Sequence, residues 1–568
     1  MQSILSVQAI LAGRSRGTYI ALRSMRERAW LLPAIGQLVY PVPEIKQLRR
    51  IVELSHPGNL QIKADGERIL FFSFRGGWST NLAQDLVVAQ ALRQRGASPF
   101  FVTCGLHLPI CDIANRNVAP PMPCDFCTSY FRRVMPLLRF PWVGLDTLVS
   151  AQERQQLERE AVSLPRSSLD SYEVQGVPVG QLVRISAPRF LLRGKVDDSA
   201  FSQDVLRRFL VSGAILVPAL KRLFAQERPD KLWTMNGLFF SEQILHWLAR
   251  DLGIPVVNYE AGFAPHSIVA ARDQIANYYD LNSHWDAESD QPLSPKEAQW
   301  LDEYLESRFA GTDPAVTTYL SGIQKRSDVI SQELQLDYTR PLVLMLTNIL
   351  WDSAVIDRNT IFDDMFHWVE ATISHFIDQP GYQLVMRVHP AEIKLTMQES
   401  HQPVLDMIRA RFPRLPGHIK LVSPTSAISS YALMRMAKCG LVYTSTTGLE
   451  MALQGKPVVV AGKTHYAGKG FTTEPASVAD YREWLSKLDH VTPLTAVQLD
   501  YARRYASMFF ARMMIPFPYV STLSQRRIRF NFSRLEELAP GQDAELDRLC
   551  DKILHCTDRG MFLLERTA

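Results

Sequence analysis

The chain has 568 residues, of which 46% are hydrophobic and 21% are charged. Both shares are close to globular averages, which excludes a disordered or fibrous protein. The 62 basic and 58 acidic residues leave a formal net charge of +4, too near balance for a surface that binds nucleic acid throughout, so we expect no nucleic-acid partner. At about 150 residues per domain, the length allows three or four units, or two large α/β domains with extensions.

Positive charge gathers at the N-terminus, where residues 1–50 carry eight Lys or Arg against two Asp or Glu. Residues 3–32 mix aliphatic side chains with arginines, as in an amphipathic helix on an anionic membrane surface. A solvated basic arm, a packed helix or a cleaved targeting peptide would have a similar composition. We predict a basic N-terminal extension over residues 1–65.

The sequence favours a cytoplasmic location. The longest apolar run, residues 209–220, is shorter than the roughly 20 residues that a membrane-spanning helix needs, so we expect no transmembrane span. Seven cysteines in a chain of this length do not form a disulfide framework, which favours a reducing compartment.

In the first half of the chain, short apolar runs alternate with longer helical periods, the pattern of a parallel α/β fold. A glycine turn, Arg75-Gly76-Gly77, follows the first run. We predict a Rossmann-like domain over residues 66–320. Its strands are expected at 69–74, 97–105, 231–237 and 254–260, and its helices at 80–96, 202–224 and 241–253.

The same alternation begins again after a polar segment near residues 294–335 and predicts a second Rossmann-like domain over residues 336–495, followed by a helical segment over 496–568. Two such domains would face each other across a cleft. The expected strands are 341–348, 382–390, 418–423, 439–445 and 456–462, and the expected helices are 359–377, 427–438 and 447–455.

Polar residues end several of the predicted strands in the second domain, at the sheet edge where α/β proteins bind ligands. They are Asn348, Arg387 with His389, and Ser445. Ser445, Thr446 and Thr447 begin a helix whose free amides suit phosphate oxygens. Glu450, one turn further on, could accept ribose hydroxyls, although Thr447 and Glu450 also have the spacing of a capping box.

Two further segments carry candidate residues. The loop 465–472 contains two glycines that allow close approach to a ligand, and Lys469 there could neutralise phosphate charge. In the first domain, Glu260 ends a predicted strand just before Gly262 and could act as a general base, or simply cap a loop. His266 is a nearby alternative base.

Four cysteines, Cys104, Cys111, Cys124 and Cys127, have the spacing C-x6-C-x12-C-x2-C. The closing pair favours a structural zinc or iron–sulfur site, but buried thiols or two separate thiol pairs would give the same sequence. The sequence has no D-x-D motif at a strand end, so we do not expect a catalytic divalent metal held by such a motif.

The segment YTSTTGLEMALQGKPVVVAGKTHYAGKGFT resembles the donor site of bacterial capsule polysaccharide biosynthesis proteins, including the Kdo-transferring capsule glycosyltransferases. RVHP is similar to the HP motif of bacterial sialyltransferases that use CMP-activated donors. NYEAGFAPHSIV resembles the family's Glu-containing segment, with Ala264-Pro265 where the family has an Arg-Pro pair.

The resemblance implies a metal-independent GT-B glycosyltransferase that needs no cofactor for catalysis, uses a nucleotide-sugar, with a CMP-sugar favoured, and glycosylates a surface, capsular or lipid-linked glycan at the inner membrane face. It implies catalytic roles for Glu260 and His389. Donor contacts are expected from Asn348, Arg387, Ser445, Thr446, Thr447, Glu450, Tyr466 and Lys469, and acceptor contacts from Arg75, Gly76, Gly77 and His266. Two alternatives are a UDP-sugar 2-epimerase, which shares the two-domain fold, and a non-catalytic protein that binds glycan or assists export.

Overall fold

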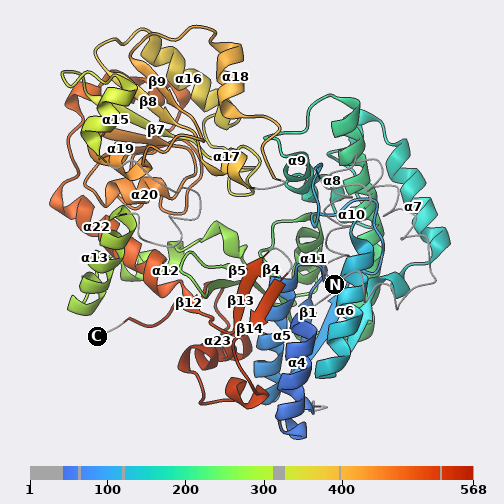
Figure 1. Ribbon diagram of the computed structural model, residues 1–568. Coiled ribbons are helices and arrows are strands. Elements are labelled where there is room, and N and C mark those ends of the chain that lie inside the picture. Colours follow the sequence, from blue (N-terminus) through green and yellow to red (C-terminus); the bar gives the residue numbers. More distant parts are fainter. Residues whose placement is uncertain are drawn as a thin grey trace, which may run out of the picture.

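The computed structural model describes residues 43–61, 65–117, 122–310, 326–395, 398–524 and 527–566. Two α/β domains are joined by helices that cross between them (Figure 1). The amphipathic helix predicted near the N-terminus lies outside the described residues. The first described helix, α4 (Pro43–Leu54), packs on the N-terminal domain.

The N-terminal domain is built on a sheet whose central strands are parallel, in the order β3-β2-β1-β4-β5. Helices from both sides bury these strands, which explains their nearly continuous apolar sequences. The strands are β1 (Arg68–Phe72), β2 (Ser98–Thr103), β3 (Trp142–Gly144), β4 (Lys231–Met235) and β5 (Val256–Ala261). The covering helices include α5 (Ser79–Gln94), α6 (Cys124–Leu138), α7 (Ala151–Ser163), α9 (Ser186–Leu191), α10 (Ala200–Glu227) and α11 (Phe240–Asp251).

Among the described helices, α10 alone is long and apolar enough to cross a membrane. However, 78% of its apolar window is buried inside the protein, where α10 packs against α7 and α11. This burial is what a core helix of an α/β domain requires.

The C-terminal domain has a wholly parallel sheet in the order β11-β10-β7-β8-β9. Together with the parallel part of the first sheet, it confirms the predicted α/β fold with two Rossmann-like domains of the GT-B type. The strands are β7 (Leu342–Leu346), β8 (Gln383–Arg387), β9 (Ile419–Val422), β10 (Cys439–Val442) and β11 (Val458–Val460). The helices include α16 (Met365–Ile377), α17 (Ala391–Lys394), α18 (Val404–Arg411), α19 (Ser430–Met436), α20 (Thr447–Ala452) and α21 (Val478–Ser486).

The end of the chain returns to the N-terminal domain, which differs from the helical segment predicted over 496–568. After α22 (Ala496–Ser507) and a π-helical turn (Met508–Arg512), the chain adds strands β12 (Ile515–Pro516) and β15 (Gly560–Met561) to the antiparallel strand β6 (Ser267–Arg272). A hairpin of β13 (Val520–Ser524) and β14 (Arg527–Phe530), and helix α23 (Ala544–His555), pack against α5. These strands complete a sheet edge that would otherwise be left unpaired.

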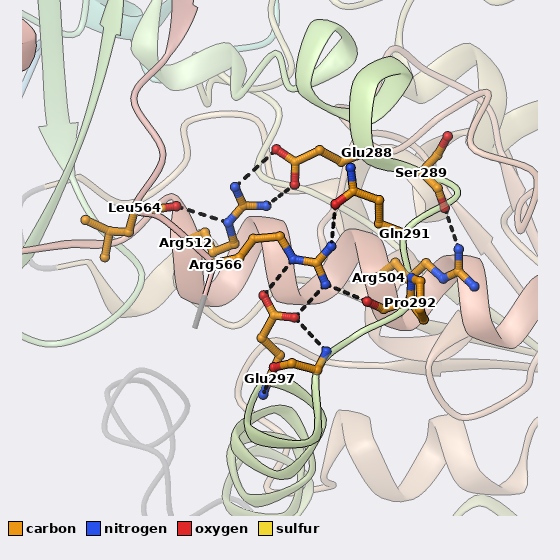
Figure 2. Close-up of polar contacts among 10 residues, drawn as sticks. Glu288, Ser289, Gln291, Pro292, Glu297, Arg504, Arg512, Leu564 and Arg566 are labelled. Atoms are coloured by element: carbon orange, nitrogen blue, oxygen red, sulfur yellow. Dashed lines mark hydrogen bonds and ion pairs between the residues drawn. The ribbon is translucent and has the colours of Figure 1, made fainter. Parts of the chain in front are cut away.

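Ion pairs fasten this returning segment to the helices that lead from one domain to the other, α12 (Asn282–Glu288) and α13 (Pro295–Ala310). Figure 2 shows Arg512 paired with Glu288, and Arg566 paired with Glu297 through hydrogen bonds of 3.1 and 2.7 Å. The helices that lead to the C-terminal domain and the segment that returns from it are therefore linked by ion pairs at one place.

Candidate active site

A cavity of about 550 Å³ lies between the domains, beside the carboxyl ends of their parallel strands. Both domains contribute to its walls, and both residues predicted to be catalytic, Glu260 and His389, line it. The N-terminal domain contributes Trp78, Ser79, Thr80, Asn81, Arg189, Met235, Asn236, Phe239, Glu260 and Asn277. The C-terminal domain contributes Ile349, Trp351, Asp352, Ser353, His389, Ala391, Leu395 and Gln398.

Glu260 lies near the end of β5 and is half-buried at the cavity wall. Its Oε1 atom accepts a hydrogen bond of 2.9 Å from the amide of Ala261. Burial raises the pKa of the Glu260 carboxyl above its usual range, although the Ala261 amide, the Asn236 side chain and the guanidinium of Arg189 act in the opposite direction. A carboxylate with a raised pKa is a stronger base, which suits proton abstraction.

His389 follows β8, where Pro390 ends the extended backbone. The amide of Ala391 donates a hydrogen bond of 3.1 Å to Nδ1 of His389, so the neutral ring carries its proton on Nε2. Burial lowers the pKa of His389 below its usual value, with Asp352 opposing the shift. At neutral pH, His389 is therefore an uncharged hydrogen-bond donor.

Asp352 is a second carboxylate in the cavity, and the sequence analysis missed it. It lies in the loop after β7, where its Oδ1 accepts a hydrogen bond of 2.9 Å from the Ala354 amide. Its position a few residues beyond a predicted strand end was the only available signal, and such a loop position is easily read as an ordinary turn.

The hydroxyl residues predicted at the donor site do gather at the end of β10. The Oγ atom of Ser445 is 2.7 Å from Oγ1 of Thr447, and Thr446 occupies the N-cap position of α20 without a side-chain cap bond. Asn348 connects two strand ends, since its Oδ1 accepts a hydrogen bond of 3.2 Å from the Thr444 amide. The buried Tyr466 donates a hydrogen bond of 2.6 Å to the carbonyl of Ser445 and holds this turn in place. None of these five predicted donor residues is among those lining the cavity between the domains.

Glu450 does not form the capping box that its spacing with Thr447 allows. Instead, its carboxylate is 1% exposed and pairs at 2.6 Å with Arg308, which belongs to α13. The predicted ribose or base contact of Glu450 thus stays a prediction, and the structure gives this residue a partner in the helix that joins the domains.

Two basic residues predicted at the donor site have internal partners. Arg387 is 1% exposed, and its guanidinium donates to the carbonyls of Ser423 and Ser426 in the loop after β9. Lys469 is buried and donates to the side chain of Asn282 in α12. Both side chains therefore bond to other parts of the chain, and their predicted phosphate contacts stay predictions.

The residues predicted to contact the acceptor also lie elsewhere. The guanidinium of Arg75 is buried, pairs with Glu242 and stacks over the Trp78 ring at 4.4 Å. Gly76 and Gly77 pack against α6, where an added Cβ at Gly77 would lie 2.8 Å from Sγ of Cys127. His266 is exposed and lines a separate cavity beside the β13–β14 hairpin. The turn 75–77 therefore packs behind the cavity wall, whereas the next four residues, 78–81, line the cavity.

In the part of the chain that the structure describes, the four clustered cysteines form no disulfide. Burial raises the pKa of Cys104 and of Cys111, and the neighbouring thiols Cys124 and Cys127 add to the shift of Cys104, so the thiols share one region. In the described part of the chain, however, no group of three or more Cys, His, Asp or Glu residues is arranged to hold a metal ion. The zinc or iron–sulfur site stays a prediction without geometric support, to be tested by elemental analysis of protein purified without chelator.

Residues 315–496 match the family model described as capsule polysaccharide biosynthesis protein. The matched segment contains His389, Ser445, Thr446 and Glu450, whereas Glu260 precedes it. This match confirms the resemblance found in the sequence. No curated protein sequence matches the chain.

Three solved structures illustrate what the chain is similar to. KpsC of Thermosulfurimonas dismutans, a beta Kdo 2,4 transferase, is 15% identical, with 49% of this chain and 79% of that chain covered and a TM-score of 0.32. UDP-GlcNAc 2-epimerase of Neisseria meningitidis is 11% identical, with coverages of 77% and 98% and a TM-score of 0.24. Sucrose-phosphate synthase of Thermosynechococcus elongatus is 12% identical, with coverages of 78% and 95% and a TM-score of 0.29. Because these TM-scores are low, the fold assignment rests on the two sheets themselves.

Proposed function

We propose that the protein is a glycosyltransferase that acts in the cleft between its domains, and the match of residues 315–496 to the capsule polysaccharide biosynthesis family model supports this proposal. The observation that carries the proposal is that Glu260 and His389 line one cavity from opposite domains. Glycosyl transfer needs a base for the incoming hydroxyl and a donor for the leaving phosphate, and these two side chains have the matching chemistry.

In the proposed reaction, Glu260 accepts the proton of the acceptor hydroxyl while that oxygen forms a bond to the anomeric carbon of the donor sugar. The bond from the anomeric carbon to the donor phosphate breaks, and its electron pair goes to the phosphate oxygen. Nε2–H of His389 donates a hydrogen bond to this oxygen as its negative charge develops. Such stabilisation acts most strongly in a site from which water is excluded.

We propose a nucleotide-sugar donor bound by the C-terminal domain, with a CMP-sugar favoured because RVHP resembles the motif of transferases that use CMP-activated donors. Ser445, Thr446 and Thr447 gather at the end of β10, where hydroxyls and helix amides suit phosphate oxygens. This proposal requires no bound metal or cofactor, because hydrogen-bond donors of His389 and of residues 445–447 would stabilise the phosphate charge.

The proposed acceptor is a surface or capsular polysaccharide or a lipid-linked glycan. The basic residues at the N-terminus support work at the inner membrane face, because Lys and Arg are attracted to anionic lipids. The protein would then be cytoplasmic and peripheral at that membrane.

The test is to incubate the full chain with CMP-, UDP- and GDP-sugars, with and without a capsular oligosaccharide acceptor, and to analyse products by mass spectrometry. We expect a product one sugar larger that requires both substrates and is lost in the Glu260→Gln/His389→Ala double variant. Isomerisation of a UDP-sugar without acceptor would instead identify a 2-epimerase. Failure of all three nucleotide classes to bind would favour the accessory role in glycan binding or export.

A further inference from the structure

The N-terminus of helix α5 opens into the cleft without a side-chain cap. Trp78 occupies the N-cap position and makes no side-chain cap bond. The first amides of any helix lack intrahelical carbonyl partners, and the helix dipole makes this end positive. Four consecutive residues at this end, Trp78, Ser79, Thr80 and Asn81, line the cavity. The helix end alone is a weak indication, so the neighbouring side chains decide what it can bind.

Ser79 supplies an independent indication of a ligand. It is 1% exposed, it lines the cavity, and its Oγ atom makes no hydrogen bond within the described structure. Buried hydroxyls in proteins normally have a hydrogen-bond partner. An oxygen atom of a ligand in the cavity would provide the partner that the chain does not.

Arg189, on α9, places a permanent positive charge at the same wall. It is half-buried, and its guanidinium lies over the ring of Phe239 at 4.8 Å from the centroid. Phe239 also packs edge-on against Trp78, with ring centroids 5.7 Å apart, so one aromatic surface connects Arg189 to the start of α5. Burial lowers the pKa of Arg189 even though Asp112, Asp352 and Glu260 act against the shift, so an additional anion would stabilise this charge.

We propose that this wall, formed by the start of α5, Ser79 and Arg189, binds an oxyanion carried by the acceptor glycan, either a carboxylate or a phosphate. The carboxylates Glu260 and Asp352 line the same cavity and would repel such a group, so Arg189 and the start of α5 must outweigh them. The assignment to the acceptor rests on the proposed function, whereas the anion preference itself follows from the wall.

The preference can be measured as binding, without turnover. The probes are a glucuronic acid-containing oligosaccharide and its carboxyl-reduced counterpart, and a glycerol phosphate-terminated oligosaccharide and its dephosphorylated counterpart. Titration calorimetry with the full chain at low, fixed salt gives four affinities. We expect at least one charged probe to bind roughly 10- to 100-fold more tightly than its neutral counterpart, the range for one charge-assisted hydrogen bond.

Two variants test the residues. Arg189→Gln should remove most of the preference. Ser79→Asp should remove it as well, because its carboxylate would occupy the anion position at the helix N-terminus. Arg193→Gln is the matched control, since Arg193 pairs with Asp197 and does not line the cavity, and it should keep the preference.

Equal affinity of the wild-type protein for charged and neutral probes would overturn the proposal, as would a preference that survives in both Arg189→Gln and Ser79→Asp. A preference lost equally in Arg193→Gln would show a general charge effect and would also overturn it. Affinity for CMP- and UDP-sugars should be unchanged in Arg189→Gln, and a loss confined to the donor would refute the acceptor assignment. A preserved charge preference in a protein without transferase activity would support the anion site while contradicting the proposed function.

Discussion

Glu260 and His389 line one cavity from opposite domains, the first from the end of β5 and the second from the segment that follows β8. Glu260 lies within β5 and His389 closely follows β8, so the two sheets hold both side chains in position. Burial moves their pKa values in opposite directions, upward for the carboxylic acid and downward for the imidazole. Both shifts favour the uncharged form, and a bound substrate would meet a basic carboxylate and a neutral donor.

We predict that Glu260→Gln lowers turnover by about 10²–10⁴-fold, the usual contribution of a positioned base. The affinity for donor should hardly change, because the variant keeps the shape of the side chain. Since burial raises the pKa of Glu260, the acidic limb of the wild-type pH–rate profile should have its midpoint above 4.5 and should disappear in the variant. Initial rates over pH 4–8 provide the measurement.

Asp352→Asn is the control for this assignment, because Asp352 lies in the same cavity. If Asp352→Asn loses turnover and the acidic limb while Glu260→Gln keeps both, the base is Asp352. His266→Ala should turn over normally, since His266 lines a different cavity.

We predict that His389→Ala weakens nucleotide binding by roughly 10- to 100-fold, as expected when a hydrogen bond to a charged group is lost. Ser445→Ala should weaken it as well, and the double variant should lose less than the sum if both groups contact one phosphate. Fluorescence competition with CMP and UDP measures these affinities. His367→Ala is the matched control, because His367 lies on α16 and does not line the cavity.

The lowered pKa of His389 also predicts a stability effect. As pH falls below 6.5, the unfolded chain binds this proton before the folded protein does, so folding stability decreases on acidification. Between pH 7.5 and 5.5, the melting temperature of His389→Gln should therefore fall less than that of the wild-type protein. Parallel losses in the two proteins would show that His389 is not held neutral by the fold.

Much of the fold could be predicted because buried parallel strands have continuous apolar sequences that differ visibly from the helical periods between them. The return of the C-terminus to the first domain could not. β12 and β15 are each two residues long, and the pairing of Ile515 with Ile268 joins segments far apart in the chain. So short a strand has no periodicity to recognise, and only the tertiary structure creates it.

The candidate site shows a similar division. Glu260 and His389 were found because each carries a chemical group at a strand end facing the cleft. Arg75 has the same kind of position, but its partner Glu242 lies in α11, and no local pattern predicts that this pair will be buried behind the wall. Arg189 was missed for the opposite reason, since α9 is a short helix with no strand before it to mark a site.

We predict that Glu450→Ala destabilises the protein by about 3–5 kcal/mol, because it leaves the charge of Arg308 largely buried without its partner. Arg308→Ala should have a similar cost, and the double variant should cost less than the two together. Urea denaturation measures the free energies. An additive double variant would show that the pair is not coupled, and an unchanged stability accompanied by lost nucleotide affinity would favour the predicted ribose contact of Glu450.

The last prediction concerns the ion pair that fastens the end of the chain to α13 (Figure 2). Glu297 is 5% exposed and accepts two hydrogen bonds from the guanidinium of Arg566. Arg566→Gln should therefore lower the free energy of unfolding by about 1.5–3 kcal/mol, the cost of losing hydrogen bonds to a charged group.

Arg548→Gln is the matched control, because Arg548 forms a partly exposed pair with Glu545 within α23 and should cost no more than about 1 kcal/mol. The pH dependence identifies the pair itself. Burial alone would raise the pKa of Glu297, but the guanidinium of Arg566 and the amide of Ser294 hold it below its ordinary value of 4.5. The stabilisation is therefore fully present above pH 4.5 and is lost as pH falls through the lowered pKa. The difference in free energy of unfolding between the wild-type protein and Arg566→Gln should shrink over that same pH interval. Denaturation curves at successive pH values measure it. A difference that is independent of pH, or no larger than that of Arg548→Gln, would mean that Arg566 contributes through packing rather than through its bond to Glu297.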